Sequence, residues 1–291
     1  MSASYEVLLD AHVHYHPCFS RAEFFSAAVR NFDAGATQLG LDGPRLGGLM
    51  FTESRGDNAF QAMAARAKPA PPADLAERHW WFRPSGEDNA LWAALGPEES
   101  ASLLLIAGRQ MVTSEGLEVL ALGCARELPD GMELTEAIGA VLSEGAIPVV
   151  PWGFGKWWLG RGQLVTELLA GDVGGRYFLG DNAGRPQALA RSHLFDRGIA
   201  RKVFVLPGSD PLPFRRQMGK AGLCGFRLGP GFEIDRPASS IIASLRSCDR
   251  QPATFGTYES LGTFALDQLA MQFRKRRPRA TTPPAGDGGP A

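Results

Sequence analysis

The start of the chain carries residues that are suited to binding a metal ion. Asp10, His12 and His14 alternate at the end of an apolar segment, and His16 follows two residues later. Side chains of an extended chain alternate between two faces, so the spacing places Asp10, His12 and His14 on one side. Neutral imidazole binds Zn, Mn or Fe, and a carboxylate adds neutralising charge. We therefore predict a metal site here; the alternative is a hydrogen-bonded, histidine-rich surface turn.

The number of histidines limits how this site is completed. The 291 residues include five histidines, and only His79 and His193 lie outside the cluster. Later segments therefore have few imidazoles to contribute, and one metal ion is expected rather than three. Any further ligands must be largely carboxylates.

Composition and charge narrow the class of protein. Hydrophobic residues make up 44% of the chain, and 30 Lys and Arg balance 31 Asp and Glu, which gives a net charge of −1. This balance gives no reason to expect membrane or nucleic-acid binding, and the basic run that begins at Arg274 is interpreted as favourable charge at a helix end. Four isolated cysteines and the absence of a leader or a long apolar run predict a reduced, cytoplasmic protein. Its oligomeric state cannot be predicted.

Short apolar runs alternate with amphipathic segments, which is typical of an α/β protein with a largely parallel sheet. Seven strands are predicted, at residues 5–10, 46–52, 102–108, 117–123, 146–151, 176–181 and 202–208. Helices are predicted at residues 21–32, 58–67, 134–143, 164–170, 187–196 and 213–221. Ser20 followed by Glu23 is a capping-box pattern for the first helix. The segment after the third strand, GRQMVTSEG, is expected to be a short excursion or a hairpin.

Two regions interrupt the alternation. Residues 67–92 are rich in proline and aromatics and are interpreted as an inserted lid loop, and residues 258–274 have the spacing of a final amphipathic helix. The expected organisation is a barrel domain over residues 1–257, a helix packed on it over residues 258–277, and a disordered tail over residues 278–291.

Polar side chains follow several of the predicted strands. In a parallel barrel, functional groups collect at the carboxyl ends of the strands. These positions hold Glu53, Arg109, Gln110, Trp152, Asp181, Asn182, Arg185 and Asp210. Asp181 and Asn182 have a simpler alternative role as caps of the following helix.

Cations near the same ends suit a small anionic substrate, because arginine binds phosphate or carboxylate through paired hydrogen bonds. The residues predicted to bind substrate are Arg109, Lys156, Arg161 and Asn182. Lys156 and Arg161 lie in GFGKWWLGRG, whose glycines allow close backbone approach and whose tryptophans offer flat walls. Ordinary core packing explains at least one of the tryptophan pairs in the chain equally well.

The DAHVH motif after a first strand, a Ser-started helix and a late apolar strand that ends in GSD together resemble the PHP superfamily (polymerase and histidinol phosphatase domain). GLEVLALG and EAIGAVLSEGAIPVV are similar to the middle of such domains. The resemblance covers Val7 to about Gly225 and implies a distorted TIM-like (β/α)7 barrel and a metal-dependent phosphoesterase. It also implies that Asp210 is a metal ligand.

This sequence departs from the family pattern at four places. TES stands where TDH is usual, Gln110 where a glutamate is usual, and PWG where a His-Pro pair is usual. Asp210 is followed by Pro211 and Leu212 and not by a histidine two residues later. These departures leave a reduced site for one divalent ion.

The expected site combines the early histidines with the late carboxylates. Its predicted metal ligands are His12, His14, Asp210, Glu53 and Asp181, and its predicted catalytic residues are Asp210, His16 and Arg185. Asp210 or His16 would accept a proton from water, although His16 has a simpler role as a hydrogen-bonding loop residue. The sequence thus favours a metal-dependent hydrolase acting on a small anionic substrate such as a phosphoester. A catalytically degenerate binding or regulatory module and an amidohydrolase-like enzyme are the alternatives.

Overall fold

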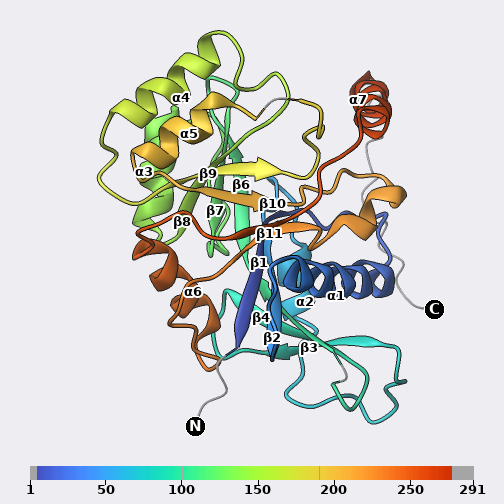
Figure 1. Cartoon of the computed structure of the whole chain (residues 1–291). Helices are drawn as coiled ribbons and strands as arrows, with labels where there is room; N and C mark the ends of the chain where they lie inside the picture. The colour runs from blue at the N-terminus through green and yellow to red at the C-terminus, as the bar shows by residue number, and fades with distance from the viewer. Residues whose placement is uncertain (1–4, 100, 190, 277–291) are drawn as a thin grey trace, which may run out of the picture.

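The computed structural model describes residues 5–99, 101–189 and 191–276 and contains two β-sheets with helices on their outer faces (Figure 1). The first sheet has seven strands in the order β12-β11-β1-β2-β5-β4-β3. These strands are β1 (Glu6–Val13), β2 (Arg45–Phe51), β3 (Trp80–Pro84), β4 (Ala90–Leu95), β5 (Ser102–Ile106), β11 (Cys224–Arg227) and β12 (Thr254–Gly256).

The second sheet has five strands in the order β10-β9-β8-β7-β6. They are β6 (Gly108–Val112), β7 (Glu118–Leu122), β8 (Ile147–Pro151), β9 (Phe178–Asn182) and β10 (Val205–Gly208). All seven predicted strands are present, and the expected hairpin after the third is formed by β6 and β7.

The prediction of a (β/α)7 barrel is wrong, because within the described residues the strands form two sheets and no closed barrel. Five strands were not predicted, and each pairs antiparallel with a neighbour: β3, β4, β6, β11 and β12. The predicted lid region supplies β3 and the beginning of β4, which extend the first sheet. Antiparallel pairs need no helical crossover, so the βα alternation breaks down at these places.

The helices cover the outer faces of the sheets, and a third apolar cluster lies between the sheets. α1 (Arg21–Gln38) and α2 (Ala59–Ala64) pack on the first sheet, whereas α3 (Leu134–Ser143), α4 (Gly160–Ala170) and α5 (His193–Ala200) pack on the second. Ser20 caps α1 as predicted by accepting a hydrogen bond from the Glu23 amide. The predicted helix at 187–196 starts later, and the one at 213–221 is the 3-10 helix η1 (Arg215–Lys220).

α6 (Pro237–Arg246) was not predicted and closes one end of the core between the sheets. Ala238, Ile241 and Leu245 join the apolar cluster that both sheets line. Arg246 donates to the carbonyl of Gly145, just before β8 begins, so α6 lies at the amino end of that strand. The carboxyl ends of β8, β9 and β10 are left free for polar residues.

The predicted C-terminal helix is present as α7 (Leu261–Arg276), but its contacts differ from those expected of an amphipathic helix. Over residues 261–273 of α7, the buried side chain is that of Asp267, which contacts Arg216 and Gln217 of η1. Leu269 and Phe273 are 58% and 66% exposed. The face of α7 that turns inward therefore combines the charge of Asp267 with Phe264, whose ring packs against Phe154. The predicted tail lies outside the described residues.

No helix in the described parts of the chain is long and apolar enough to span a membrane.

The two sheets are in direct backbone contact where β10 passes β1. The amide of Asp210 donates to the carbonyl of His12 (2.8 Å), and Gly208 lies directly against the His12 backbone. A Cβ atom on Gly208 would lie 2.3 Å from the His12 nitrogen. Only glycine allows this contact between the two strands.

We expect Gly208→Ala to lower the free energy of unfolding by about 3 kcal/mol or more, because backbone atoms must shift to admit the methyl group. Gly139→Ala is the control: a Cβ on this glycine of α3 meets nothing within 4 Å, and alanine favours a helix by about 0.5–1 kcal/mol. Urea denaturation measures both changes. Equal stability of Gly208→Ala and the wild type would contradict the close contact.

Candidate metal site

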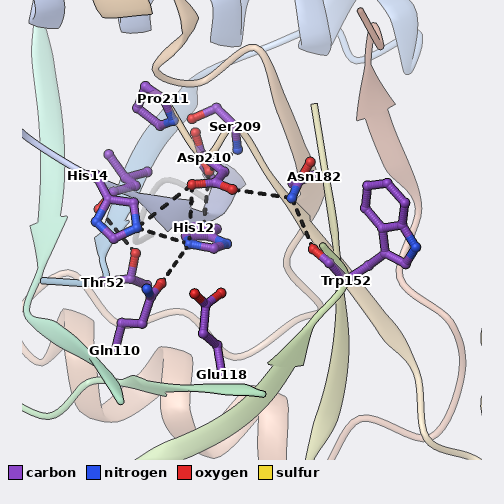
Figure 2. A network of polar contacts seen from close by, with 12 residues as sticks. His12, His14, Thr52, Gln110, Glu118, Trp152, Asn182, Ser209, Asp210 and Pro211 are labelled. Carbon is purple, nitrogen blue, oxygen red and sulfur yellow. Dashed lines mark hydrogen bonds and ion pairs between the residues drawn. The ribbon is translucent and has the colours of Figure 1, made fainter. Parts of the chain in front are cut away.

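β1 carries the first residues of the site and is irregular there. Asp10 pairs with Leu49 of β2 and Val13 pairs with Phe51, so three steps along β1 match two along β2. Such a bulge re-aims the side chains around it. Asp10 consequently faces backbone amides, while His12 and His14 converge on each other (Figure 2).

Asp10 joins three segments of the chain. It is fully buried, and its carboxylate accepts hydrogen bonds from the amides of Ser209 (2.8 Å), Gly222 (2.8 Å) and His12 (3.2 Å). Burial raises the pKa of Asp10 to about 6, against the hydrogen bonds from Ser209, Gly222 and His12, which lower it. Asp10 therefore positions the segments that carry His12 and Ser209 and is not itself a ligand in the metal-binding group.

His12, His14 and Asp210 form a group that could hold a metal ion. The Nε2 atoms of His12 and His14 are 3.1 Å apart, and they lie 3.5 and 3.7 Å from Oδ1 of Asp210. Ligand distances of about 2.0–2.2 Å would place neighbouring ligands of a tetrahedral ion about 3.3–3.6 Å apart. The three atoms thus fit one face of a tetrahedron, and a fourth position remains for water or substrate.

Asp210 is held in place by its backbone and by Asn182. Its φ of 44° lies in the left-handed region, which aspartate adopts at less cost than most residues. Asn182, at the end of β9, donates from Nδ2 to Oδ2 of Asp210 (3.2 Å) and to the carbonyl of Trp152 (3.1 Å). One carboxylate oxygen is therefore fixed by the amide, and the other faces the histidines.

The electrostatics keep His14 and Asp210 in metal-binding forms. Burial, with the nearby charge of His12, lowers the pKa of His14 to about 3, so this imidazole is neutral. Burial acts to raise the pKa of Asp210, but the charges of His12, His14 and Lys156 outweigh it and the pKa is lowered.

Two residues at the site lay outside the predicted ligand and substrate sets. Oε1 of Gln110 lies 3.2 Å from Nε2 of His12, and Glu118 of β7 points toward the same histidine (Figure 2). Glu118 alternates with Leu120 and Leu122, which belong to the core between the sheets. A charged residue on the apolar face of a strand was the signal that could have identified it.

The structure does not bring Glu53 into the group of three. Its Oε1 accepts a hydrogen bond from the Phe60 amide (2.7 Å), and its Oε2 lies 3.4 Å from Arg109. Arg109 also donates to the carbonyls of Asp57 and Ala125. Both residues are buried and join the segment after β2 to β6, so their predicted roles in binding metal and substrate stay predictions.

Asp181 and Arg185 likewise pair with each other. Nε and Nη2 of Arg185 donate to the two carboxylate oxygens of Asp181 at 3.0 and 2.9 Å, and the hydroxyl of Tyr258 donates to Asp181 at 2.9 Å. The Arg185 guanidinium lies 4.2 Å from the centre of the Tyr258 ring. These contacts fix the segment before α7 to the end of β9.

His16, Lys156 and Arg161 lie in loops around the group. Nε2 of His16 is 3.0 Å from the carbonyl of Pro211, next to Asp210, and its ring stacks on His14. Lys156 forms an ion pair with Glu118. Arg161 donates to the carbonyls of Gly155 (2.8 Å) and Gly116 (3.5 Å), so its described hydrogen bonds go to the backbone.

Two of the tryptophans that were predicted to offer flat walls do line a cavity. Trp157 and Trp158 line a cavity of about 490 Å³ between α4 and the segment that leads into α5. The Trp152 side chain lines the same cavity and points away from His12 (Figure 2). Trp80 and Trp81 are buried on β3, as ordinary packing predicts.

Comparisons with known proteins bear on the fold. No protein-family model matches the chain, and neither does any curated protein. PsfC from Pseudomonas syringae PB-5123 is similar in structure with a TM-score of 0.50 and 15% identity, over 94% of this chain and 99% of PsfC. The lesion-specific endonuclease PfuEndoQ from Pyrococcus furiosus gives a TM-score of 0.46 and 14% identity, over 95% and 67% of the two chains. The likeness to PsfC is one of overall fold.

We expect Asp10→Asn to lower the free energy of unfolding by about 1–3 kcal/mol, because the amide turns a donor toward one of three buried backbone N–H groups. Asp33→Asn is the matched control: Asp33 is 51% exposed and pairs with Arg45, and the loss of such a surface pair costs at most about 1 kcal/mol. Urea denaturation gives both values. Equal effects of the two substitutions would contradict the role of Asp10.

Proposed function

We propose that this protein is a metal-dependent hydrolase related to the PHP superfamily, acting on a small anionic substrate such as a phosphoester. The observation that carries the proposal is the convergence of His12, His14 and Asp210 on one point. Two imidazoles and one carboxylate are typical of a catalytic centre in which three protein ligands leave a position open.

In this proposal each residue of the site has a distinct role in hydrolysis. A divalent ion at the site would lower the pKa of a water molecule and polarise the bond to be cleaved. Asp210 would take up the proton from water, and Asn182 would orient its carboxylate through the 3.2 Å hydrogen bond. His16 would hold the Asp210 loop through Pro211, and Lys156 would bind the anionic group of the substrate.

A catalytically degenerate binding module is the second candidate, and Gln110 favours it. Its neutral amide oxygen lies 3.2 Å from His12, at the place where the family pattern has a glutamate. A metal centre of this kind has one carboxylate fewer to bridge a second ion. Such a protein would bind the metal and an anion without turning the anion over.

We expect the protein, freed of metal by a chelator, to take up one Zn²⁺ or Mn²⁺ per chain. Loss of a residue that hydrogen-bonds a metal ligand weakens metal affinity by about 10–100-fold, so we expect an effect of this size for Asn182→Ala. His12→Ala, His14→Ala and Asp210→Asn each remove a ligand itself and should weaken metal binding by more. Calorimetric titration measures these affinities. His79→Ala is the control, since His79 is exposed. Unchanged affinity in the His12 and His14 variants would rule out the site.

Turnover separates the two candidates. We expect the metal-loaded protein to hydrolyse small phosphomonoesters such as p-nitrophenyl phosphate, and Asp210→Asn to abolish this activity, because it removes both a ligand and the proton acceptor. Phosphate release measures the rate. Stoichiometric metal binding without any turnover that depends on His12 would favour the binding module.

A further inference from the structure

Glu118 occupies an unusual position for a charged residue. It begins β7 on the strand face that continues with Leu120 and Leu122 into the core between the sheets, and its side chain is 18% exposed. Its carboxylate points toward His12 (Figure 2). Buried charges are usually paired, and this carboxylate forms an ion pair with Lys156.

Lys156 reaches Glu118 from the loop after β8 and is guided there by two features. Its amide donates to the carbonyl of Gly153 (2.9 Å), and its aliphatic stem lies so close to Gly153 that a Cβ there would be 2.7 Å from Cδ of Lys156. Arg161 donates to Gly155 beside Lys156 and to Gly116 in the turn before Glu118. Arg161 therefore ties the loop of the cation to the turn that precedes the carboxylate.

Lys156 also lies beside the metal site, because it pairs with Glu118, whose carboxylate points toward His12 (Figure 2). The other predicted cations direct their groups elsewhere: Arg109 contacts Glu53, Asp57 and Ala125, and Arg185 contacts Asp181. The side chain of Lys156 is 33% exposed, so a ligand in solution has access to it. Lys156 thus lies between one carboxylate that holds it and a site that an anion would enter.

We propose that Lys156 binds the anionic group of the substrate and that Glu118 is a built-in competitor for this cation, which restricts the site to dianionic groups of the phosphate type. The inference rests on the proposed function and names the substrate class of the same site. A substrate carboxylate would have to displace the Glu118 carboxylate from Lys156, which is a group of the same kind. Glu118 has the advantage in this competition because it is tethered beside Lys156 at high effective concentration. A phosphate dianion brings more charge and more acceptor oxygens, and so displaces Glu118.

The test measures binding of inorganic phosphate and of acetate to the Mn²⁺-loaded protein by calorimetry. Glu118→Gln should tighten phosphate binding by up to about fivefold, the upper end for a partly exposed ion pair, and should tighten acetate binding by a larger factor. Equal factors for the two anions would contradict a role of Glu118 in selecting dianions. Lys156→Met should weaken phosphate binding by a similar or larger factor. The double variant should behave like Lys156→Met, because the competitor has no effect once the cation is gone.

Two further variants keep the test decisive. Gly153→Ala leaves both charges in place but displaces the stem of Lys156, so it should weaken phosphate binding even if Glu118→Gln fails to fold. Glu144→Gln is the matched control, because it removes an ion pair with Arg126 beyond the opposite end of β7, and it should leave phosphate binding unchanged.

Some outcomes would overturn the inference. Weaker phosphate binding in Glu118→Gln would make Glu118 a support for Lys156 and not its competitor. Equal phosphate binding in the wild type and Lys156→Met, with one Mn²⁺ still bound, would refute the inference and leave the proposed metal site standing. Failure to bind Mn²⁺ at all would instead count against the proposed function.

Discussion

The arrangement of the site depends on the buried carboxylate of Asp10. It accepts hydrogen bonds from the amides of His12, Ser209 and Gly222, which belong to segments about 200 residues apart in the chain. These bonds place the histidines of β1 next to the loop that carries Asp210. The close contact of Gly208 with the His12 backbone completes the junction. A metal ion bound by His12, His14 and Asp210 would require this junction, because the junction brings together the two segments that carry the ligands.

Most charged residues around the site pair with one another. Glu53 pairs with Arg109, and Asp181 pairs with Arg185. Such buried pairs connect neighbouring segments, and breaking one partner is costly because it leaves a buried charge uncompensated. Asp210 differs because its Oδ1 faces the imidazoles of His12 and His14. Among the described residues, the groups available to bind a metal ion are therefore few: His12, His14 and Asp210.

Local patterns predicted much of the framework. The seven strands with continuous apolar character were found because buried strands need such residues on both faces. α3 was predicted with its bounds, and the Ser20 cap of α1 was also predicted. The added strands β3, β4, β6, β11 and β12 all pair antiparallel with a neighbour. Their pairing is decided by neighbours elsewhere in the chain, and this is why an alternating pattern led to a barrel that the two sheets do not form.

The sequence by itself determined that His12 and His14 stand at the end of a first buried strand and that Asp210 follows a late one. Tertiary structure decided which polar residues join them, because an ion pair between distant segments leaves no local pattern. It turned Asp10 away from the histidines through a bulge in β1 and bound Glu53 to Arg109. It also brought Glu118 and Lys156 together. Spacing along a regular strand predicts the direction of a side chain, whereas bulges and partners depend on how the strands and sheets pack.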